Sequence, residues 1–196
     1  MKTKPRILPR IYYNRPTLTV ARSLIGKYVV REIDGRILAG KILEVEAYVG
    51  PQDKACHASK GRTQRTEVLF GPPGVAYVYL IYGMYHCLNV VTEREEFPSA
   101  VLIRAIEING ELIDGPGRLC RALQIDRRLN RVDLTTGEFI WFEDRGVLME
   151  RGDVGAHLRI GVDYAGEWVK KLWRFRLRMA IAPNRTGRTK TQGGAG

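Results

Sequence analysis

The sequence predicts an α+β fold in one domain, and three observations support this prediction. Helix-like and strand-like segments mix along the chain without the regular strand–helix–strand rhythm of parallel sheets. Two stretches, Lys27–Val49 and Ala76–Val91, each have the pattern of two strands joined by a tight turn. The 196 residues are 44% hydrophobic and no Ser/Gly/Pro-rich linker divides them. We therefore expect a single domain over residues 1–196 with one sizeable core.

The N-terminal part combines a basic segment with a short helix. Residues 1–15 predict an extended basic arm, and we expect residues 1–10 and the tail 186–196 to be flexible. A helix is expected to begin at Pro16-Thr17 and to end at Gly26. Its apolar positions recur at helical spacing, at Leu18, Ala21, Leu24 and Ile25.

The next stretch predicts a hairpin whose second strand carries carboxylates. Lys27–Glu32 and Arg36–Val49 are joined by Asp34-Gly35, a typical hairpin turn. Because alternate side chains share a face, one face of the second strand is apolar and the other carries Ile42, Glu44, Glu46 and Tyr48. A buried glutamate must be paired or used. This face is therefore either a salt-bridged part of the sheet or part of a functional site.

A polar, basic loop follows over residues 50–67. Its candidate functional residues are His57, Lys60, Arg62 and Arg65. His57 lies eleven residues after Glu46, near enough to share a site. A histidine that is only solvated or locally hydrogen-bonded is the alternative.

The hairpin predicted over Ala76–Val91 is unusually rich in aromatic residues. The preceding FGPPG sequence excludes regular structure, and residues on both sides of Gly83 are β-branched, aromatic or aliphatic. Tyr82, Gly83 and Met84 are left at the tip. A flat side chain on a narrow two-stranded projection can wedge between nucleic-acid bases. Ordinary core aromatic residues are the alternative interpretation.

The second half of the chain predicts shorter elements. Ser99–Ile108 is a buried strand with one charge, Arg104, which needs a carboxylate partner such as Glu46 or Glu44. A Gly-Pro loop opens a helix near Arg118, and a short strand is expected around residues 139–142. A Trp-bearing segment and a basic strand end the domain.

Charge and cysteine content limit the class of protein. The net charge is +11, and eight Lys or Arg residues but no acids follow residue 169, so a polyanionic partner is expected. The three cysteines, Cys56, Cys87 and Cys120, do not match a disulfide framework. Zinc-binding spacings are missing from the sequence, so we expect neither a metal nor another cofactor. No long apolar run occurs, so we expect a soluble, unprocessed intracellular protein with no membrane partner.

Several motifs together resemble one family. They are EVEAY (44–48), DKACHASKGRTQR (53–65), FGPPGVAYVYLIYGMYHCLNVV (70–91), AVLIRAIE (100–107), GPGRLCRAL (115–123) and RIGVDYAGEW (159–168). In this order they closely resemble the alkyladenine DNA glycosylases, also called 3-methyladenine or methylpurine DNA glycosylases, from about Arg10 to Arg178. The resemblance implies a curved antiparallel sheet with flanking helices and a hairpin that enters the minor groove of duplex DNA. It also implies that the damaged nucleotide would be flipped out of the DNA helix.

The resemblance also implies roles for individual residues. Glu46 would be the general base and would hold a water together with Arg104. Tyr82 would intercalate into the space left by the flipped base. The base pocket would consist of Tyr48 and Tyr79 as stacking faces, His57 and Asn89 at the base edges, and the main chain near Ala55 as a donor. DNA contacts are expected from Arg62, Arg65, Met84 and Tyr85.

The same resemblance implies the reaction and its products. Release of 3-methyladenine, 7-methylguanine, hypoxanthine or ethenoadenine would leave an abasic site. Since no lysine is placed for a Schiff base, the enzyme would be monofunctional and would act as a monomer on double-stranded DNA. Three positions depart from the family pattern: Thr66, His86 and the segment 180–184. They leave the lesion preference open.

Other classes of protein remain possible interpretations of the same residues. A non-enzymatic protein that binds damaged DNA would use the same hairpin, but Glu46 among phosphates would not help it. A nuclease or deaminase would need metal ligands that the sequence does not show. A basic RNA-binding domain of the formyltransferase type would share the shape without the set Glu46, Tyr48, His57 and Tyr82.

Overall fold

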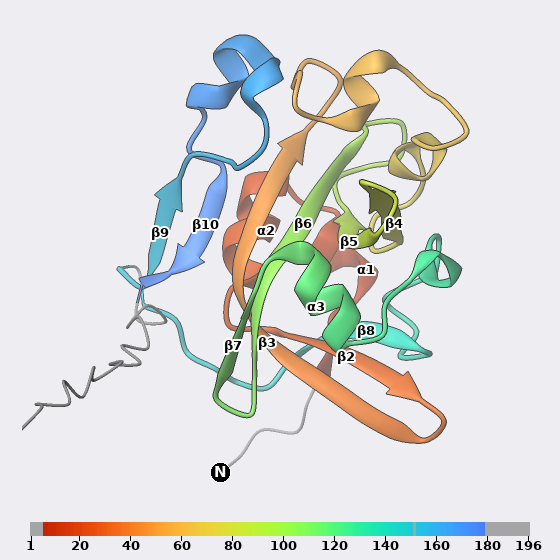
Figure 1. Ribbon diagram of the computed structural model, residues 1–196, viewed down its shortest axis with the longest axis vertical. Helices are drawn as coiled ribbons and strands as arrows, with labels where there is room; N and C mark the ends of the chain where they lie inside the picture. Colours follow the sequence, from red (N-terminus) through yellow and green to blue (C-terminus); the bar gives the residue numbers. More distant parts are fainter. Residues whose placement is uncertain (1–5, 151, 179–196) are drawn as a thin grey trace, which may run out of the picture.

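The computed structural model describes residues 6–150 and 152–178, which are built around a ten-stranded antiparallel sheet (Figure 1). The strands lie in the order β1-β8-β2-β3-β6-β5-β4, with β7 paired to β6 and β10 paired to both β3 and β9. The strands are β1 (Arg6–Ile7), β2 (Tyr28–Ile33), β3 (Arg36–Val49), β4 (Ala76–Ile81), β5 (Tyr85–Val91), β6 (Ser99–Ile108), β7 (Glu111–Asp114), β8 (Ile140–Asp144), β9 (Val154–His157) and β10 (Arg174–Leu177). The α-helices are α1 (Arg10–Tyr13), α2 (Thr17–Leu24) and α3 (Pro116–Ala122), and the 3₁₀ helices are η1 (His57–Lys60), η2 (Glu67–Phe70), η3 (Arg127–Leu129) and η4 (Asp163–Lys170). The predicted mixed fold with an antiparallel sheet is confirmed.

Most elements lie where the local patterns predict them. The helix predicted after Pro16 is α2, and the chain turns at Gly26 with a φ of 83°. Asp34 and Gly35 join β2 to β3 with φ angles of 49° and 77°, the left-handed values that a two-residue hairpin turn needs. The aromatic hairpin forms from β4 and β5, which pair antiparallel from Ala76–Val90 to Ile81–Tyr85.

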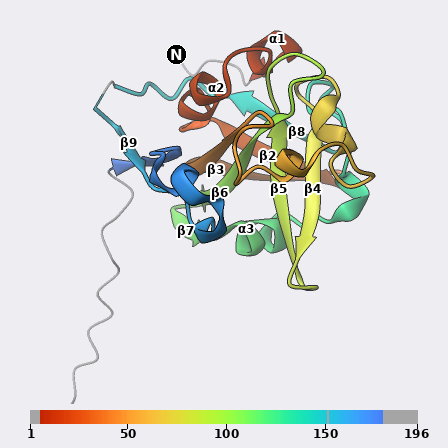
Figure 2. The same ribbon diagram turned by 90° about the horizontal axis from the view of Figure 1, so that it is seen from above.

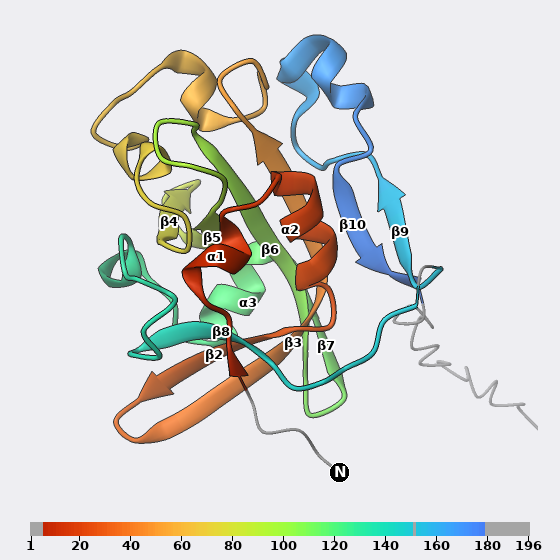
Figure 3. The same ribbon diagram turned by 180° about the vertical axis from the view of Figure 1, so that it is seen from behind.

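The long strand β3 is the central element, and helices lie on both sides of the sheet that contains it. It pairs with β2 along its first half, with β10 along its second half and with β6 on the other edge. Helix α2 lies against β3 and β6, and α3 lies on the other side of the sheet, against β5 and β6 (Figures 1 and 3). Val45 and Ala47 are buried in the same cluster as Leu24 of α2. The opposite face, with Glu46 and Tyr48, is turned toward α3, whose Pro116 lines the same cavity as Tyr48.

The N-terminal segment is not the extended arm that its basic residues predict. From residue 6 it is folded: β1 pairs with β8, α1 follows, and Leu8 and Tyr13 are buried. The Tyr13 ring packs against Phe142 of β8, with ring centroids 6.4 Å apart. The prediction was wrong because it weighed the basic residues above the two apolar side chains, whose burial stabilises the segment.

A few further expectations are changed or lie outside the described residues. The patterns do not predict β7 and β9, since each is only four residues long and β7 is also largely exposed. Residues 1–5, the tail 186–196 and the segment 180–184 are outside the described part of the chain. None of the helices within residues 6–150 and 152–178 is long and apolar enough for a membrane span.

Candidate active site

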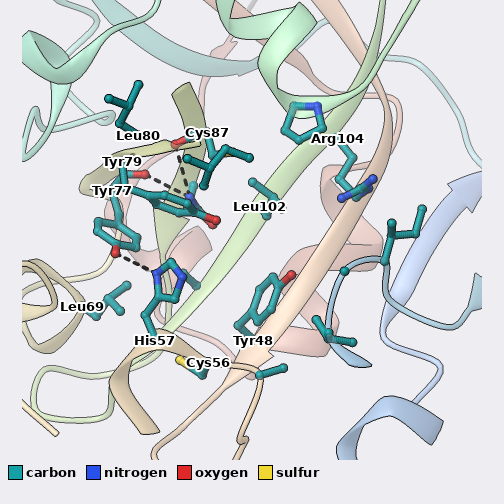
Figure 4. A pocket seen from close by; sticks show the side chains of 18 of the residues that line it. Tyr48, Cys56, His57, Leu69, Tyr77, Tyr79, Leu80, Cys87, Leu102 and Arg104 are labelled. Carbon is teal, nitrogen blue, oxygen red and sulfur yellow. Dashed lines mark hydrogen bonds between the residues drawn. The ribbon is translucent and has the colours of Figure 1, made fainter. Parts of the chain in front are cut away.

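A cavity of about 540 Å³ opens on the α3 side of the sheet, between the ends of β3 and the aromatic hairpin (Figure 4). Strands β3, β4, β5 and β6 contribute to its walls together with several loops and helix ends, so residues far apart in the sequence meet there. Its polar and aromatic lining consists of Tyr48, His57, Arg65, Tyr77, Tyr79, Tyr82, Asn89, Arg104 and Tyr164. Figure 4 shows Tyr48 on one side of the cavity and His57, Tyr77 and Tyr79 on the other. The cavity therefore has aromatic walls and polar groups at its edges.

Glu46 lies directly behind this wall and is 0% exposed. Its Oε1 accepts a hydrogen bond from the Ile160 N–H at 2.8 Å, and its Oε2 accepts one from the Tyr48 hydroxyl at 2.8 Å. The Arg104 Nε is 3.5 Å from Oε1. Burial raises the pKa of Glu46, while Arg104, the Ile160 N–H and the Tyr48 hydroxyl act in the opposite direction. Glu46 is thus a carboxylate whose proton affinity is increased but whose ionised form has three supporting partners.

Arg104 joins Glu46 to the second carboxylate on the same face of β3. Its Nε is 3.1 Å from Oε1 of Glu44, so both carboxylate partners expected for Arg104 are present. Strand β10 adds Arg174 and Arg176, each with a nitrogen 3.2 Å from a Glu44 oxygen. Among the described residues, Glu44 therefore has three arginine ion-pair partners, although its Oε2 has no hydrogen-bond partner, whereas Glu46 has only Arg104 as an ion-pair partner. The two carboxylates therefore differ in the amount of positive charge beside them.

His57 and two tyrosines of β4 form a contact group on one side of the cavity. The His57 Nδ1 and the Tyr77 hydroxyl are 2.9 Å apart, and the His57 ring meets the Tyr79 ring edge-on at 4.7 Å. Burial, followed by the charges of Arg65 and Lys60, lowers the pKa of His57 to about 4. The imidazole is consequently neutral at physiological pH and can donate from one nitrogen and accept at the other.

Asn89 and the Ala55 segment occupy the remaining predicted pocket positions. Asn89 is buried, and its side-chain amide donates to the Tyr77 carbonyl at 3.1 Å. The Ala55 N–H donates to Asp53 at 3.1 Å, and the Ala55 carbonyl accepts from the Tyr164 hydroxyl at 3.4 Å. Both residues line the cavity, but the N–H of Ala55 itself is engaged inside the protein.

The tip of the hairpin extends away from the body of the protein (Figure 2). Tyr82 is 86% exposed and Met84 is 63% exposed, while Tyr85 is about one-third exposed. Tyr82 and Gly83 have φ angles of 50° and 70°, which turn the chain back on itself within the tip. A large aromatic ring is therefore held in solvent next to the cavity that it also helps to line.

The two basic loop residues differ in their availability. Arg62 forms ion pairs with Glu67 and Glu96 and stacks over the Phe70 ring at 4.3 Å. Arg65 lines the cavity, lies 5.1 Å from the centre of the Tyr79 ring and has no carboxylate partner in the described chain. Thr66, a departure from the family pattern, closes this loop by hydrogen bonding to Gly61 and Thr63. Of the two arginines, Arg65 therefore has the less committed charge and the position inside the cavity.

Several residues in and behind the site were not predicted. Tyr77, Ile160 and Tyr164 contribute hydrogen bonds to His57, Glu46 and Ala55, and Asp53 and Arg159 form a buried ion pair behind Tyr48. Each lies in a motif that carries the family resemblance, but their partners come from distant segments. Among the described residues, no group of three or more His, Cys, Asp or Glu side chains could hold a metal ion.

Comparisons with known proteins all indicate the same family. A family model described as Methylpurine-DNA glycosylase (MPG) matches residues 11–180. A protein of Methanocella arvoryzae is 50% identical over 185 residues, which cover 86% of this chain and 91% of that relative. Proteins of Legionella pneumophila and Myxococcus xanthus are 50% and 49% identical and cover 87% of this chain, with 93% and 90% of their own lengths matched. All three relatives carry names that make them candidate 3-methyladenine DNA glycosylases.

Proposed function

The chain belongs to the methylpurine-DNA glycosylase family and is a DNA glycosylase of DNA repair, and on this premise we propose how it acts. It flips an alkylated or deaminated purine out of duplex DNA and hydrolyses the N-glycosidic bond with water, leaving an abasic site. The lesions are 3-methyladenine, 7-methylguanine, hypoxanthine and ethenoadenine. The observation that carries the proposal is a buried glutamate, Glu46, with three supporting partners directly behind an aromatic cavity.

Glu46 acts as the general base that orients and deprotonates the attacking water. Each of its oxygens accepts one short hydrogen bond, so lone pairs remain for a water. Because the carboxylate is fully covered, the water must enter between Tyr48, Arg104 and Ile160, which line the cavity in front of it. The anion also stabilises the positive charge that develops on the sugar as the bond breaks. A methylated purine that is already cationic needs little further help to leave.

The flipped base lies between Tyr48 and Tyr79. Stacking on an aromatic side chain contributes about 1–3 kcal/mol for each base, and it tolerates different purines. His57 and Asn89 contact the edges of the base, and their hydrogen bonds to Tyr77 orient both of them. A neutral leaving base needs a hydrogen-bond donor, and the main chain near Ala55 supplies it. The Ala55 N–H already donates to Asp53, so the donor is a neighbouring N–H.

The hairpin and the basic surface hold the duplex. Tyr82 fills the space that the flipped base leaves, and Met84 and Tyr85 contact the flanking nucleotides from the same tip. Arg62, Arg65 and the net charge of +11 contribute contacts to phosphates that do not depend on sequence. One copy of the chain is enough for a single damaged nucleotide, so the enzyme acts as a monomer.

Single-turnover base release tests the proposal. Four duplexes, each with one of the four lesions, are incubated with excess wild-type protein or Glu46→Gln in a chelator. We expect release by the wild type and a rate about 100- to 10,000-fold lower for Glu46→Gln, with DNA binding retained. Glu107→Gln is the matched control. Glu107 lies in the part of β6 that is distant from the cavity, and it forms an ion pair with Lys41.

Two outcomes would contradict parts of the proposal. If Glu46→Gln released bases as fast as wild type, another group would have to activate the water. If sodium borohydride trapped a covalent protein–DNA adduct, the enzyme would not be monofunctional, since such an adduct requires an amine nucleophile.

A further inference from the structure

A fully buried ion pair lies behind the cavity and has no part in the chemistry proposed above. Asp53 and Arg159 have side chains that are 0% exposed, although they are 106 residues apart in the sequence. The guanidinium donates to both carboxylate oxygens, at 2.6 Å and 2.9 Å, which is the bidentate geometry of a strong pair. Neither residue lines the cavity, so the pair acts on the site only through its neighbours.

The remaining hydrogen bonds of the pair connect three segments of the site. Asp53 accepts from the N–H groups of Val49, at the end of β3, and of Ala55, in the loop before η1, both at 3.1 Å. Arg159 donates to the carbonyl of Ala47 in β3 at 2.9 Å and to that of Trp168 in η4 at 3.3 Å. The pair therefore ties the end of β3 to the Ala55 loop and to the segment 159–168.

Arg159 also supports the Tyr48 ring from behind. Its guanidinium carbon is 4.9 Å from the centre of the Tyr48 ring and 5.1 Å from that of Trp173. Since Tyr48 lines the cavity and the buried Arg159 does not, the guanidinium is on the side of the ring that faces away from the cavity. A flat cation in this position limits how far the Tyr48 ring can move away from the cavity.

The residue after Arg159 reaches the general base itself. Ile160 donates its N–H to Oε1 of Glu46 at 2.8 Å, so a shift of Arg159 moves a hydrogen-bond donor of Glu46. We propose that Asp53 and Arg159 are a positioning pair, which holds the Tyr48 ring, the Ile160 N–H and the Ala55 loop in the arrangement that base release requires. This inference rests on the glycosylase mechanism proposed above.

Stability alone is a poor explanation for such a pair. Removing two charges from water is costly, and apolar residues of similar volume often serve a fold equally well or better. The Nε of Arg159 is also buried without a hydrogen-bond partner within the described residues. Orientation of several groups at once is what a planar, forked guanidinium provides and an apolar pair does not.

The test separates folding from positioning. Asp53→Asn and Arg159→Met each leave one buried group without its partner, so each should lower the urea midpoint. The double variant Asp53→Asn/Arg159→Met removes both charges at similar volume, and its midpoint should lie closer to that of wild type than either single variant. We nevertheless expect its single-turnover rate to fall about 100-fold, since small misplacements of catalytic groups have effects of this size. Its affinity for a duplex with an abasic-site analogue should stay within a few-fold of wild type.

Two further variants complete the experiment. Arg159→Lys keeps the positive charge opposite Asp53 but lacks the planar, forked guanidinium. It should therefore fold and show the same loss of rate. If the double variant does not fold, the rate of Arg159→Lys tests the inference. Lys27→Met/Asp144→Asn removes a partly buried ion pair between the residue that precedes β2 and one in β8, away from the cavity, and should leave base release unchanged. If the double variant or Arg159→Lys folds and releases bases within a few-fold of wild type, the pair is only structural and the inference fails. If the wild type releases no base, the proposed function fails instead.

Discussion

Replacing Tyr48 with phenylalanine removes a single hydroxyl and leaves the stacking ring in place. This hydroxyl donates to Oε2 of Glu46 at 2.8 Å. Burial, together with the neighbouring charge of Glu46, raises the pKa of Tyr48 well above its ordinary value, so the hydroxyl keeps its proton and remains a donor. The substitution therefore removes one of the three groups that support the ionised form of Glu46.

The sign and size of the effect follow from this contact. Burial raises the pKa of Glu46, and loss of the Tyr48 hydroxyl raises it further. A general base works when it is ionised, so activity is present above this pKa and is lost as the pH falls through it. Hydrogen bonds to charged groups contribute about 1.5–3 kcal/mol, and 1.36 kcal/mol corresponds to a factor of ten. On the acid limb of the pH profile, below the pKa of Glu46, Tyr48→Phe should be about 10- to 100-fold slower than wild type. On the alkaline plateau, where Glu46 is ionised in both proteins, the difference should disappear.

The assay is single-turnover release of hypoxanthine with enzyme in excess, from about pH 4 to about pH 9, because this rate reports ionisations in the enzyme–DNA complex. Tyr79→Phe is the matched control, since it removes a hydroxyl from the opposite side of the cavity. Its acid limb should coincide with that of wild type. A loss that is equal at all pH values in Tyr48→Phe would refute the reasoning, because the hydroxyl would then not act through the ionisation of Glu46.

Three further predictions concern other residues of the site and the core. Tyr82→Ala should leave the free energy of unfolding within about 0.5 kcal/mol of wild type in urea denaturation, because the side chain is exposed, and should weaken binding to a lesion duplex by about 1–3 kcal/mol in fluorescence titration. Unchanged affinity would show that Tyr82 does not enter the helix. The ring of His57 should titrate with a midpoint of about 4 in NMR spectra of the free protein, and an ordinary midpoint of 6.5 would mean that its burial and the charges of Arg65 and Lys60 do not act as described. Tyr13→Phe should increase the free energy of unfolding by about 1 kcal/mol, because the buried Tyr13 hydroxyl has no hydrogen-bond partner in the described residues; a loss of stability would indicate that a partner exists.

Local sequence was sufficient to predict the elements that carry the site. The period of two in β3 puts Glu44, Glu46 and Tyr48 on one face, as predicted. Ile42, which the same alternation places on that face, lies in the core with Val45 instead, because the pairing register with β6 shifts between Ile42 and Glu44. The turn residues around Gly83 and the strand-forming residues beside it similarly predict a hairpin with Tyr82 at its tip. These predictions succeeded because backbone geometry and side-chain alternation depend on neighbouring residues.

Identical residue types on one strand could not be told apart by the same means. Glu44 and Glu46 have the same spacing and the same kind of neighbours in the sequence. Their difference arises from β10, which brings Arg174 and Arg176 to Glu44 from 130 and 132 positions away, while Ile160 comes to Glu46. The prediction for the N-terminal segment was wrong for a related reason, since the burial of Tyr13 depends on contact with Phe142 of β8.

The sequence by itself therefore determined the class of fold, the strand face with Glu46 and the exposed aromatic tip. Only the tertiary structure decided which groups surround Glu46, that Tyr77 orients His57, and that Asp53 and Arg159 stand behind Tyr48. The physical reason is the range of the interactions. Alternation and turn geometry act between adjacent residues, whereas burial, ion pairing and the resulting pKa shifts depend on segments that meet only when the core has formed.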